Sequence, residues 1–269
     1  MLLVYPLIDV NDLIDGDPGK PHVVTPITGE HGSSATAFHI VTGPGDSPRV
    51  HRHNHCDEVS ILLSGNGVYG LGDQLNPARA GECRVAPKGV DHYFANQSDE
   101  MSLMVGFYMG VPDGAAAGTV FSNSATQSDQ SGIQINLDDV QPENMDQGEG
   151  WMITDFRLPI SARNGYSSTL FRAKFLPGAV HKKHAHENCE EIYYIISGHG
   201  LAGAGPDRVE VHSGHFHYIP KGVEHWLHNL SATEPIEVVG IYIDAGSVAD
   251  TGYVYRGDVT PDDLKERTV

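Results

Sequence analysis

Positive charge is scarce in this sequence of 269 residues, where 17 Lys and Arg stand against 35 Asp and Glu for a formal net charge of −18. Nucleic acids and anionic membrane surfaces are bound through basic patches, so the deficit argues against both classes of partner. No DNA-binding segment is visible either. We attribute the acidity to solubility in water.

Cysteine and long apolar runs are also lacking. The three cysteines are Cys56, Cys83 and Cys189. A disulfide framework would need more cysteines and an even number of them. No apolar run approaches the roughly 18 residues that a membrane helix needs. The apolar N-terminus has no basic residue before Lys20, whereas a signal peptide begins with a basic region. We therefore expect a cytoplasmic protein.

Strong helical patterns are few, and 31 glycines and 16 prolines divide the chain into short segments. Between them lie runs rich in β-branched and aromatic residues, a pattern typical of short strands in an all-β sandwich or barrel. The expected strands are Thr36–Val41, Glu58–Leu63, Leu103–Tyr108, Thr169–Phe175, Ile192–Ile196 and Ile236–Ile243.

One long motif occurs twice in the chain. Its first part contains His-x-His followed by Glu and ends at a glycine, and its second part contains Pro-Lys-Gly followed by His and Asn. Each His and Glu of the first copy recurs 133 residues later. A repeat this regular indicates a duplicated unit, so we expect two domains of about 130 residues. Residues 1–140 form the first, with an N-terminal arm and an acidic linker, and residues 141–269 form the second, with a C-terminal tail.

The spacing within each copy predicts a metal site. Side chains two apart on a strand face the same way, so a His-x-His pair presents two imidazoles together. The glutamate returns after a short turn, and the last histidine comes from a later strand. Three imidazoles and one carboxylate suit Fe, Mn, Ni, Cu or Zn, and we favour iron, up to one ion per domain. The candidate ligands are His51, His53, Glu58 and His92, and then His184, His186, Glu191 and His225.

With these motifs the chain resembles a bicupin of the cupin superfamily. Both copies fit the patterns G-x5-H-x-H-x4-E-x6-G and G-x5-P-x-G-x2-H-x3-N at every fixed position. The resemblance implies two tandem jelly-roll β-barrels with little helix, and the same eight metal ligands. It does not fix the reaction, because one fold supports many functions.

Two residues of the second copy are candidates for catalysis. Tyr193 lies two residues after Glu191 and shares its strand face, so its hydroxyl is placed to donate a hydrogen bond to a metal-bound ligand. A core tyrosine with a satisfied hydroxyl is an equal alternative. Arg172 would supply a cation for a carboxylate or enolate if it turned inward, the alternative being a solvated outer face.

The leading functional hypothesis is a metal-dependent oxidoreductase, an Fe(II)-type dioxygenase acting on a small oxygenated organic molecule. One alternative is a non-oxidative decarboxylase, isomerase, lyase or cyclase that uses Lewis-acid chemistry. Oxalate decarboxylases have a similar layout, but they carry an arginine where this chain has Pro48 and His181. The other alternative is a non-enzymatic binder of a small molecule or metal. Exposed sheet edges and the N-terminal arm also favour a homo-oligomer such as a dimer.

Overall fold

Antiparallel strands make up nearly all of the regular structure in the computed structural model, which describes residues 5–128, 130, 132–144, 153–179 and 182–265. Within these residues the helical segments are single 3₁₀ turns, and no helix is long and apolar enough to span a membrane. The predicted all-β class is therefore confirmed. The 3₁₀ turns are η1 (Val10–Leu13), η2 (Gly29–His31), η3 (Leu137–Asp139), η5 (Ala162–Asn164) and η6 (Ala249–Thr251).

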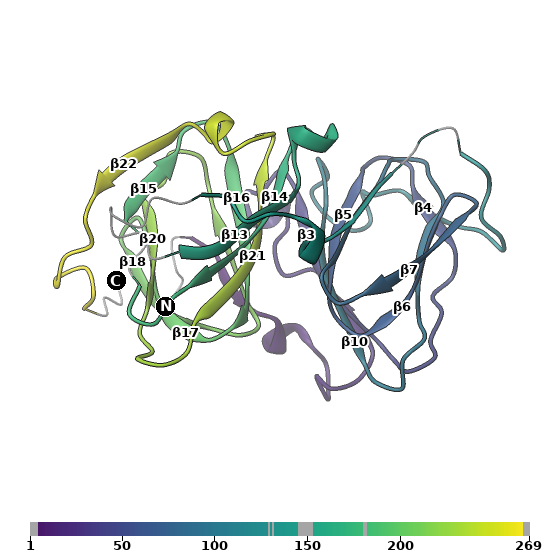
Figure 1. Cartoon of the computed structure of the whole chain (residues 1–269), viewed down its shortest axis with the longest axis horizontal. Coiled ribbons are helices and arrows are strands. Elements are labelled where there is room, and N and C mark those ends of the chain that lie inside the picture. The colour runs from purple at the N-terminus through teal and green to yellow at the C-terminus, as the bar shows by residue number, and fades with distance from the viewer. Residues whose placement is uncertain (1–4, 129, 131, 145–152, 180–181, 266–269) are drawn as a thin grey trace. The chain divides into compact units, whose positions relative to one another are not determined.

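The chain divides into two compact units, and each contains two antiparallel sheets (Figure 1). The N-terminal unit spans Val10–Val140. The C-terminal unit spans Gln141–Val269 and also takes in the beginning of the chain up to Asp9. We expected the N-terminal arm to belong to the first domain, but Leu7–Asp9 adds an edge strand to a sheet of the C-terminal unit, where it pairs with His215–His217.

The N-terminal unit has a six-stranded sheet in the order β12-β8-β5-β10-β3-β2 and a five-stranded sheet in the order β11-β4-β9-β6-β7. The first sheet contains β2 (His22–Val24), β3 (Thr36–Thr42), β5 (Glu58–Ser64), β8 (Glu82–Ala86), β10 (Ser102–Tyr108) and β12 (Ile133–Asn136). The second contains β4 (His51–His53), β6 (Asn66–Leu71), β7 (Gln74–Arg79), β9 (His92–Asn96) and β11 (Thr119–Phe121).

The C-terminal unit repeats this arrangement with sheets ordered β1-β19-β16-β21-β14-β13 and β18-β17-β20-β15-β22. The first contains β1 (Leu7–Asp9), β13 (Ile153–Ile160), β14 (Thr169–Phe175), β16 (Glu190–Ser197), β19 (His215–Ile219) and β21 (Ile236–Ile243). The second contains β15 (Lys183–His186), β17 (His199–Ala204), β18 (Asp207–His212), β20 (His225–Asn229) and β22 (Tyr253–Gly257).

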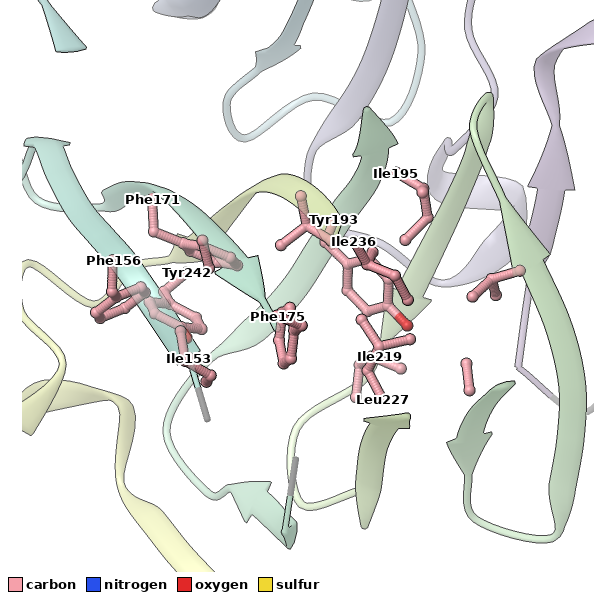
Figure 2. Packing of buried hydrophobic residues seen from close by; sticks show 14 of the residues in the cluster. Ile153, Phe156, Phe171, Phe175, Tyr193, Ile195, Ile219, Leu227, Ile236 and Tyr242 are labelled. Atoms are coloured by element: carbon pink, nitrogen blue, oxygen red, sulfur yellow. The ribbon is translucent and has the colours of Figure 1, made fainter. Parts of the chain in front are cut away.

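Each unit buries apolar side chains between its two sheets, as expected of alternating strands. In the C-terminal unit Figure 2 shows Phe156, Phe171, Phe175 and Tyr242 gathered from β13, β14 and β21, with Leu227 approaching from β20. The N-terminal unit has a smaller cluster that includes Phe38, Leu62, Tyr69 and Phe94.

The glycines that end each His-x-His motif occupy tight turns. Gly65 has φ of 90° and Gly198 has φ of 87°, a left-handed conformation that favours glycine. A Cβ on Gly198 would lie only 2.5 Å from the carbonyl oxygen of Pro235, so no larger residue fits there. The motif glycine therefore fixes the turn that follows the glutamate strand.

The asparagines that end each copy of the motif hold neighbouring loops together. The Asn96 amide donates to the carbonyl oxygens of Thr42, Gly43 and Glu100 at 3.2, 2.9 and 2.8 Å. Asn229 makes the corresponding three bonds in the C-terminal unit. Both asparagines are buried, so each amide satisfies carbonyl groups that lie close to it at the end of a strand.

We predict that Asn96→Ala lowers the free energy of unfolding by about 3 kcal/mol, because several acceptors would lose a buried donor. Urea denaturation followed by far-UV circular dichroism measures this change. The exposed Asn66→Ala variant in the same unit is the matched control. A loss no larger than that of the control would contradict the assigned role.

Candidate metal centres

In the N-terminal unit the structure brings together the side chains of His51, His53, Glu58 and His92. One ligand atom from each lies within 4.8 Å of all the others. His51 and His92 face each other across β4 and β9, while Glu58 begins β5 of the opposite sheet. The Nε2 atoms of His53 and His92 each lie 3.3 Å from Oε2 of Glu58. Two sheets therefore contribute to a single cluster.

The C-terminal unit builds the same cluster from His184, His186, Glu191 and His225, again within 4.8 Å. His184 pairs with His225 across β15 and β20. The Nε2 atoms of His186 and His225 lie 3.3 and 3.1 Å from Oε2 of Glu191. All eight predicted ligands thus lie in two clusters of identical composition.

Backbone hydrogen bonds prepare the histidines for a metal. Nδ1 of His184 and of His225 donates to the carbonyl oxygen two residues earlier, at 2.8 and 2.9 Å. His51 and His92 make the same bonds at 3.0 and 2.9 Å. Because the Nδ1 proton is engaged by a carbonyl, the neutral ring presents the lone pair of Nε2 to the cluster, as a metal requires.

The remaining histidine differs between the units. Nδ1 of His53 lies 3.0 Å from the Thr119 hydroxyl, whereas both ring nitrogens of His186 are buried with no hydrogen-bond partner. A buried imidazole with an unused Nε2 beside a carboxylate is the arrangement that a metal ion would complete. Both donor sets therefore fit a divalent transition metal.

The two carboxylates are kept ionised. Burial would raise the pKa of Glu58, but its close contacts with His92, Arg84 and His53 hold it well below its ordinary range. Burial opposes ionisation of Glu191 too, but the neighbouring His186 and His225 lower its pKa. Burial and the nearby His92 lower the pKa of His51 to about 4, so this ring is neutral at pH 7.

The environment of the glutamate differs between the clusters. In the N-terminal unit Nη2 of Arg84 lies 2.6 Å from Oε1 of Glu58, and both side chains are almost fully buried. The residue 133 positions later is His217, which bonds Tyr193 at 2.6 Å between Nδ1 and the hydroxyl oxygen. We did not single out Arg84 from the sequence, although the offset of the repeat pairs it with His217.

Only the C-terminal cluster lines the large cavity found among the described residues, with a volume of about 660 Å³. Most of the lining is aromatic or aliphatic. It includes Ile153, Phe156, Phe171, Phe175, Leu227 and Tyr242, which Figure 2 labels, together with Ala173, Val238 and Tyr253. Tyr193 also lines it. No described lining residue is Lys or Arg. The cavity therefore offers an apolar volume that ends at the metal ligands.

The structure places Tyr193 at the cavity but does not bring Arg172 there. On β14 the residues Phe171, Ala173 and Phe175 line the cavity, so Arg172 has the opposite parity. Its guanidinium forms ion pairs with Asp155 and Glu237. Arg172 is therefore held in ion pairs on the face of β14 opposite the cavity, and it does not line the cavity. His181, which we considered with the oxalate decarboxylase pattern, lies outside the described residues.

A third group of titratable side chains lies where β1 joins the C-terminal sheet. The Nε2 atoms of His212 and His215 are 3.8 and 3.7 Å from Oδ2 of Asp9. However, Nδ1 of His215 accepts a hydrogen bond from the His212 backbone N–H, so Nε2 carries the proton of the neutral ring. That tautomer suits the Asp9 carboxylate better than it suits a metal.

Comparison with known proteins gives one family and several similar folds. The family model described as "Cupin domain" matches residues 38–108 and 171–242, more than half of the chain. An oxalate-binding protein from Thermotoga maritima is 27% identical over 116 residues, which covers 42% of this chain and 95% of that protein.

Two solved structures have the same fold at low sequence identity. Lactobacillus farciminis oxalate decarboxylase in a formate complex has a TM-score of 0.73 at 12% identity, covering 95% of this chain and 89% of that chain. Bacillus subtilis oxalate decarboxylase, described for its Mn(II) centres, has a TM-score of 0.72 at 12% identity, covering 95% and 80%. The arrangement of two tandem barrels is thus confirmed.

We predict that the purified protein holds up to two equivalents of a divalent metal, and that Glu58→Ala and Glu191→Ala each lose about one, because each removes the anionic ligand of one cluster. Elemental analysis by mass spectrometry gives the stoichiometry. Glu190→Ala, on the opposite strand face from Glu191, is the matched control and should retain both. A double variant that keeps its metal would show that the ions lie elsewhere.

Proposed function

Since the chain belongs to the cupin domain family, we propose that its C-terminal unit is the active centre of a metal-dependent decarboxylase for an organic acid with an apolar body. The observation that carries the proposal is the apolar cavity of about 660 Å³ that ends on His184, His186, Glu191 and His225. A metal site with an adjoining apolar cavity suits a small molecule that is charged at one end.

A non-oxidative reaction is favoured over the iron dioxygenase that we first inferred from the sequence. The similar structures are oxalate decarboxylases, one of them described for Mn(II) centres, and none of the comparisons supports iron or a dioxygenase. Decarboxylation was among the sequence-based alternatives, and these similarities support it better. They are similarities of fold, so the reaction itself is our proposal.

The lining of the cavity argues against oxalate as the substrate. Oxalate is a small dianion with no apolar surface, and the described lining contains no Lys or Arg to neutralise a second carboxylate. Phe171, Phe175 and Leu227 instead offer apolar contact area. We therefore assign to the site an acid with a single carboxylate and an aromatic or branched aliphatic body.

The cavity would assist loss of carbon dioxide by exclusion of water. A substrate body bound against Phe171, Phe175 and Leu227 displaces water from the cavity. Its carboxylate at the metal end therefore loses hydration, and the negative charge spreads into the substrate as the carbon–carbon bond breaks. A divalent ion, when bound by the four ligands, would supply Lewis-acid polarisation of substrate oxygen atoms. The products are carbon dioxide and the protonated remainder of the acid, and no oxidant is needed.

Tyr193 is the group placed to deliver the proton. Burial, followed by the Glu191 charge, raises the pKa of Tyr193 well above its ordinary value, so the hydroxyl stays protonated. Burial and the nearby His225 lower the pKa of His217 to about 3, so this ring is neutral. When Nδ1 of His217 carries the proton, it donates to the Tyr193 oxygen and leaves the tyrosine O–H free to protonate the carbon that loses carbon dioxide.

We predict that the metal-loaded enzyme releases carbon dioxide from apolar monocarboxylic acids, such as aromatic acids with an activating ring oxygen, and does not act on oxalate. The test is a panel of acids assayed both for carbon dioxide release and for oxygen uptake. Oxygen consumed in proportion to turnover would replace the decarboxylase with a dioxygenase at the same site. A ligand that binds tightly but is never converted would favour a binding protein.

We further expect Tyr193→Phe to lower kcat by about 10²–10³-fold with little change in KM, since it removes the proton donor but keeps the aromatic ring. Steady-state kinetics on a converted acid measures both constants. Tyr194→Phe, one residue along β16 and packed against Phe216, is the matched control. An unchanged kcat in Tyr193→Phe would remove Tyr193 from the reaction.

A further inference from the structure

We infer that Arg84 divides the duplicated centres into two metal sites of unequal affinity, the weaker in the N-terminal unit and the tighter in the C-terminal unit. The inference concerns metal affinity alone and does not rest on the proposed reaction. It starts from Arg84, which contacts Glu58 in the N-terminal cluster. Among the described residues, no Lys or Arg forms an ion pair with Glu191 in the C-terminal cluster.

Arg84 is built into the N-terminal cluster. Its side chain is 2% exposed, Nη2 bonds Oε1 of Glu58 at 2.6 Å, and Nη1 donates to the Tyr93 carbonyl oxygen at 3.3 Å. The guanidinium also lies over the ring of Tyr69, with Cζ 4.3 Å from the ring centroid. These contacts hold a permanent positive charge on the far oxygen of the carboxylate that would bind the metal.

The C-terminal cluster has no such cation in the described part of the chain. The equivalent residue, His217, bonds the Tyr193 hydroxyl and is neutral because burial lowers its pKa. Among the described residues, the side chains within 4 Å of the Glu191 carboxylate that could carry a positive charge are the two ligand histidines, His186 at 3.3 Å and His225 at 3.1 Å.

The charge offered to an incoming cation therefore differs by one unit. Glu58 and Arg84 together are neutral, whereas Glu191 presents a full negative charge to the metal. Affinity for a divalent cation rises with the negative charge of its ligand set. The metal-free state favours the same order of affinities. The buried Glu191 carboxylate has no cation beside it and is less stable without a metal, so metal binding lowers the free energy of the C-terminal cluster by more.

One contact acts in the opposite direction. Thr119 lies 3.0 Å from Nδ1 of His53 and supports that ring, while Nδ1 of His186 has no partner. Such outer contacts favour binding by positioning the ligand. A full charge on the ligating carboxylate outweighs one neutral hydrogen bond, since charged hydrogen-bonded pairs are about twice as strong.

The test is a titration of metal-free protein with Co²⁺ alone, followed by the visible absorption of the bound ion and by competition with a chelator. Glu191→Ala leaves only the N-terminal site and Glu58→Ala leaves only the C-terminal site. We expect the N-terminal site to bind Co²⁺ at least tenfold more weakly, which corresponds to about 1.4 kcal/mol. Equal affinities, or a weaker C-terminal site, would overturn the inference.

The role of Arg84 itself is tested in the Glu191→Ala background. Arg84→Gln removes the charge but keeps a hydrogen-bond donor near Glu58, and it should tighten Co²⁺ binding about tenfold. Arg84→Lys keeps the charge and should leave the affinity of the N-terminal site low. Circular dichroism establishes that each variant is folded. If Arg84→Gln fails to fold, the reciprocal His217→Arg in the Glu58→Ala background should weaken the C-terminal site. Unchanged affinity in the folded variant would refute the assignment.

Discussion

The fold of each unit is organised around one buried carboxylate that must be neutralised. Glu58 is the first residue of β5 and Glu191 the second residue of β16, and both are buried in the barrel interior, where an unpaired charge is strongly unfavourable. Histidines from the opposite sheet supply the surrounding nitrogen atoms. In His51, His92, His184 and His225 the backbone carbonyl two residues earlier accepts the Nδ1 proton, so Nε2 is turned toward the carboxylate. The metal chemistry of the site follows from the strand pairing.

The two units neutralise the buried carboxylate in different ways, and the difference decides whether the barrel has room for a substrate. Arg84 neutralises Glu58 and fills interior space with its side chain over Tyr69. At the matching place in the C-terminal unit His217 bonds Tyr193, and the space beside the ligands is a cavity. The two units therefore differ at two equivalent positions: the N-terminal unit has Ser60 and Arg84 where the C-terminal unit has Tyr193 and His217. The Arg84 side chain fills the interior of the N-terminal unit, whereas the C-terminal unit contains the cavity.

The sequence alone predicted much of the fold because its strongest signals are local. The expected strand Thr169–Phe175 has the bounds of β14, and Glu58–Leu63 differs from β5 by one residue. The ligand sets were accessible because the spacing of the repeat carries them. Arg172 was misleading since residue type suggested a role, while the alternation of Phe171, Arg172 and Ala173 already implied an outward side chain.

The cavity and the arm could not be predicted in this way, because they depend on contacts between distant segments. Phe156 and Tyr253 line the same space from opposite ends of the unit, about a hundred residues apart in the sequence. The arm pairs with β19, more than two hundred residues away. No periodicity within either segment encodes its partner, so only the folded chain reveals which motif copy opens onto an apolar volume.

A duplicated metal site can specialise through the charge of a single interior residue, since that charge acts on the carboxylate and on the space beside it together. An arginine at position 84 compensates Glu58 without a metal, and it also excludes a substrate from the region its side chain fills. A neutral histidine at position 217 leaves Glu191 dependent on the ion and frees Tyr193 to face the cavity. Metal affinity and substrate access are therefore coupled within each barrel, so that the unit with the more strongly held metal is also the unit with room for a substrate.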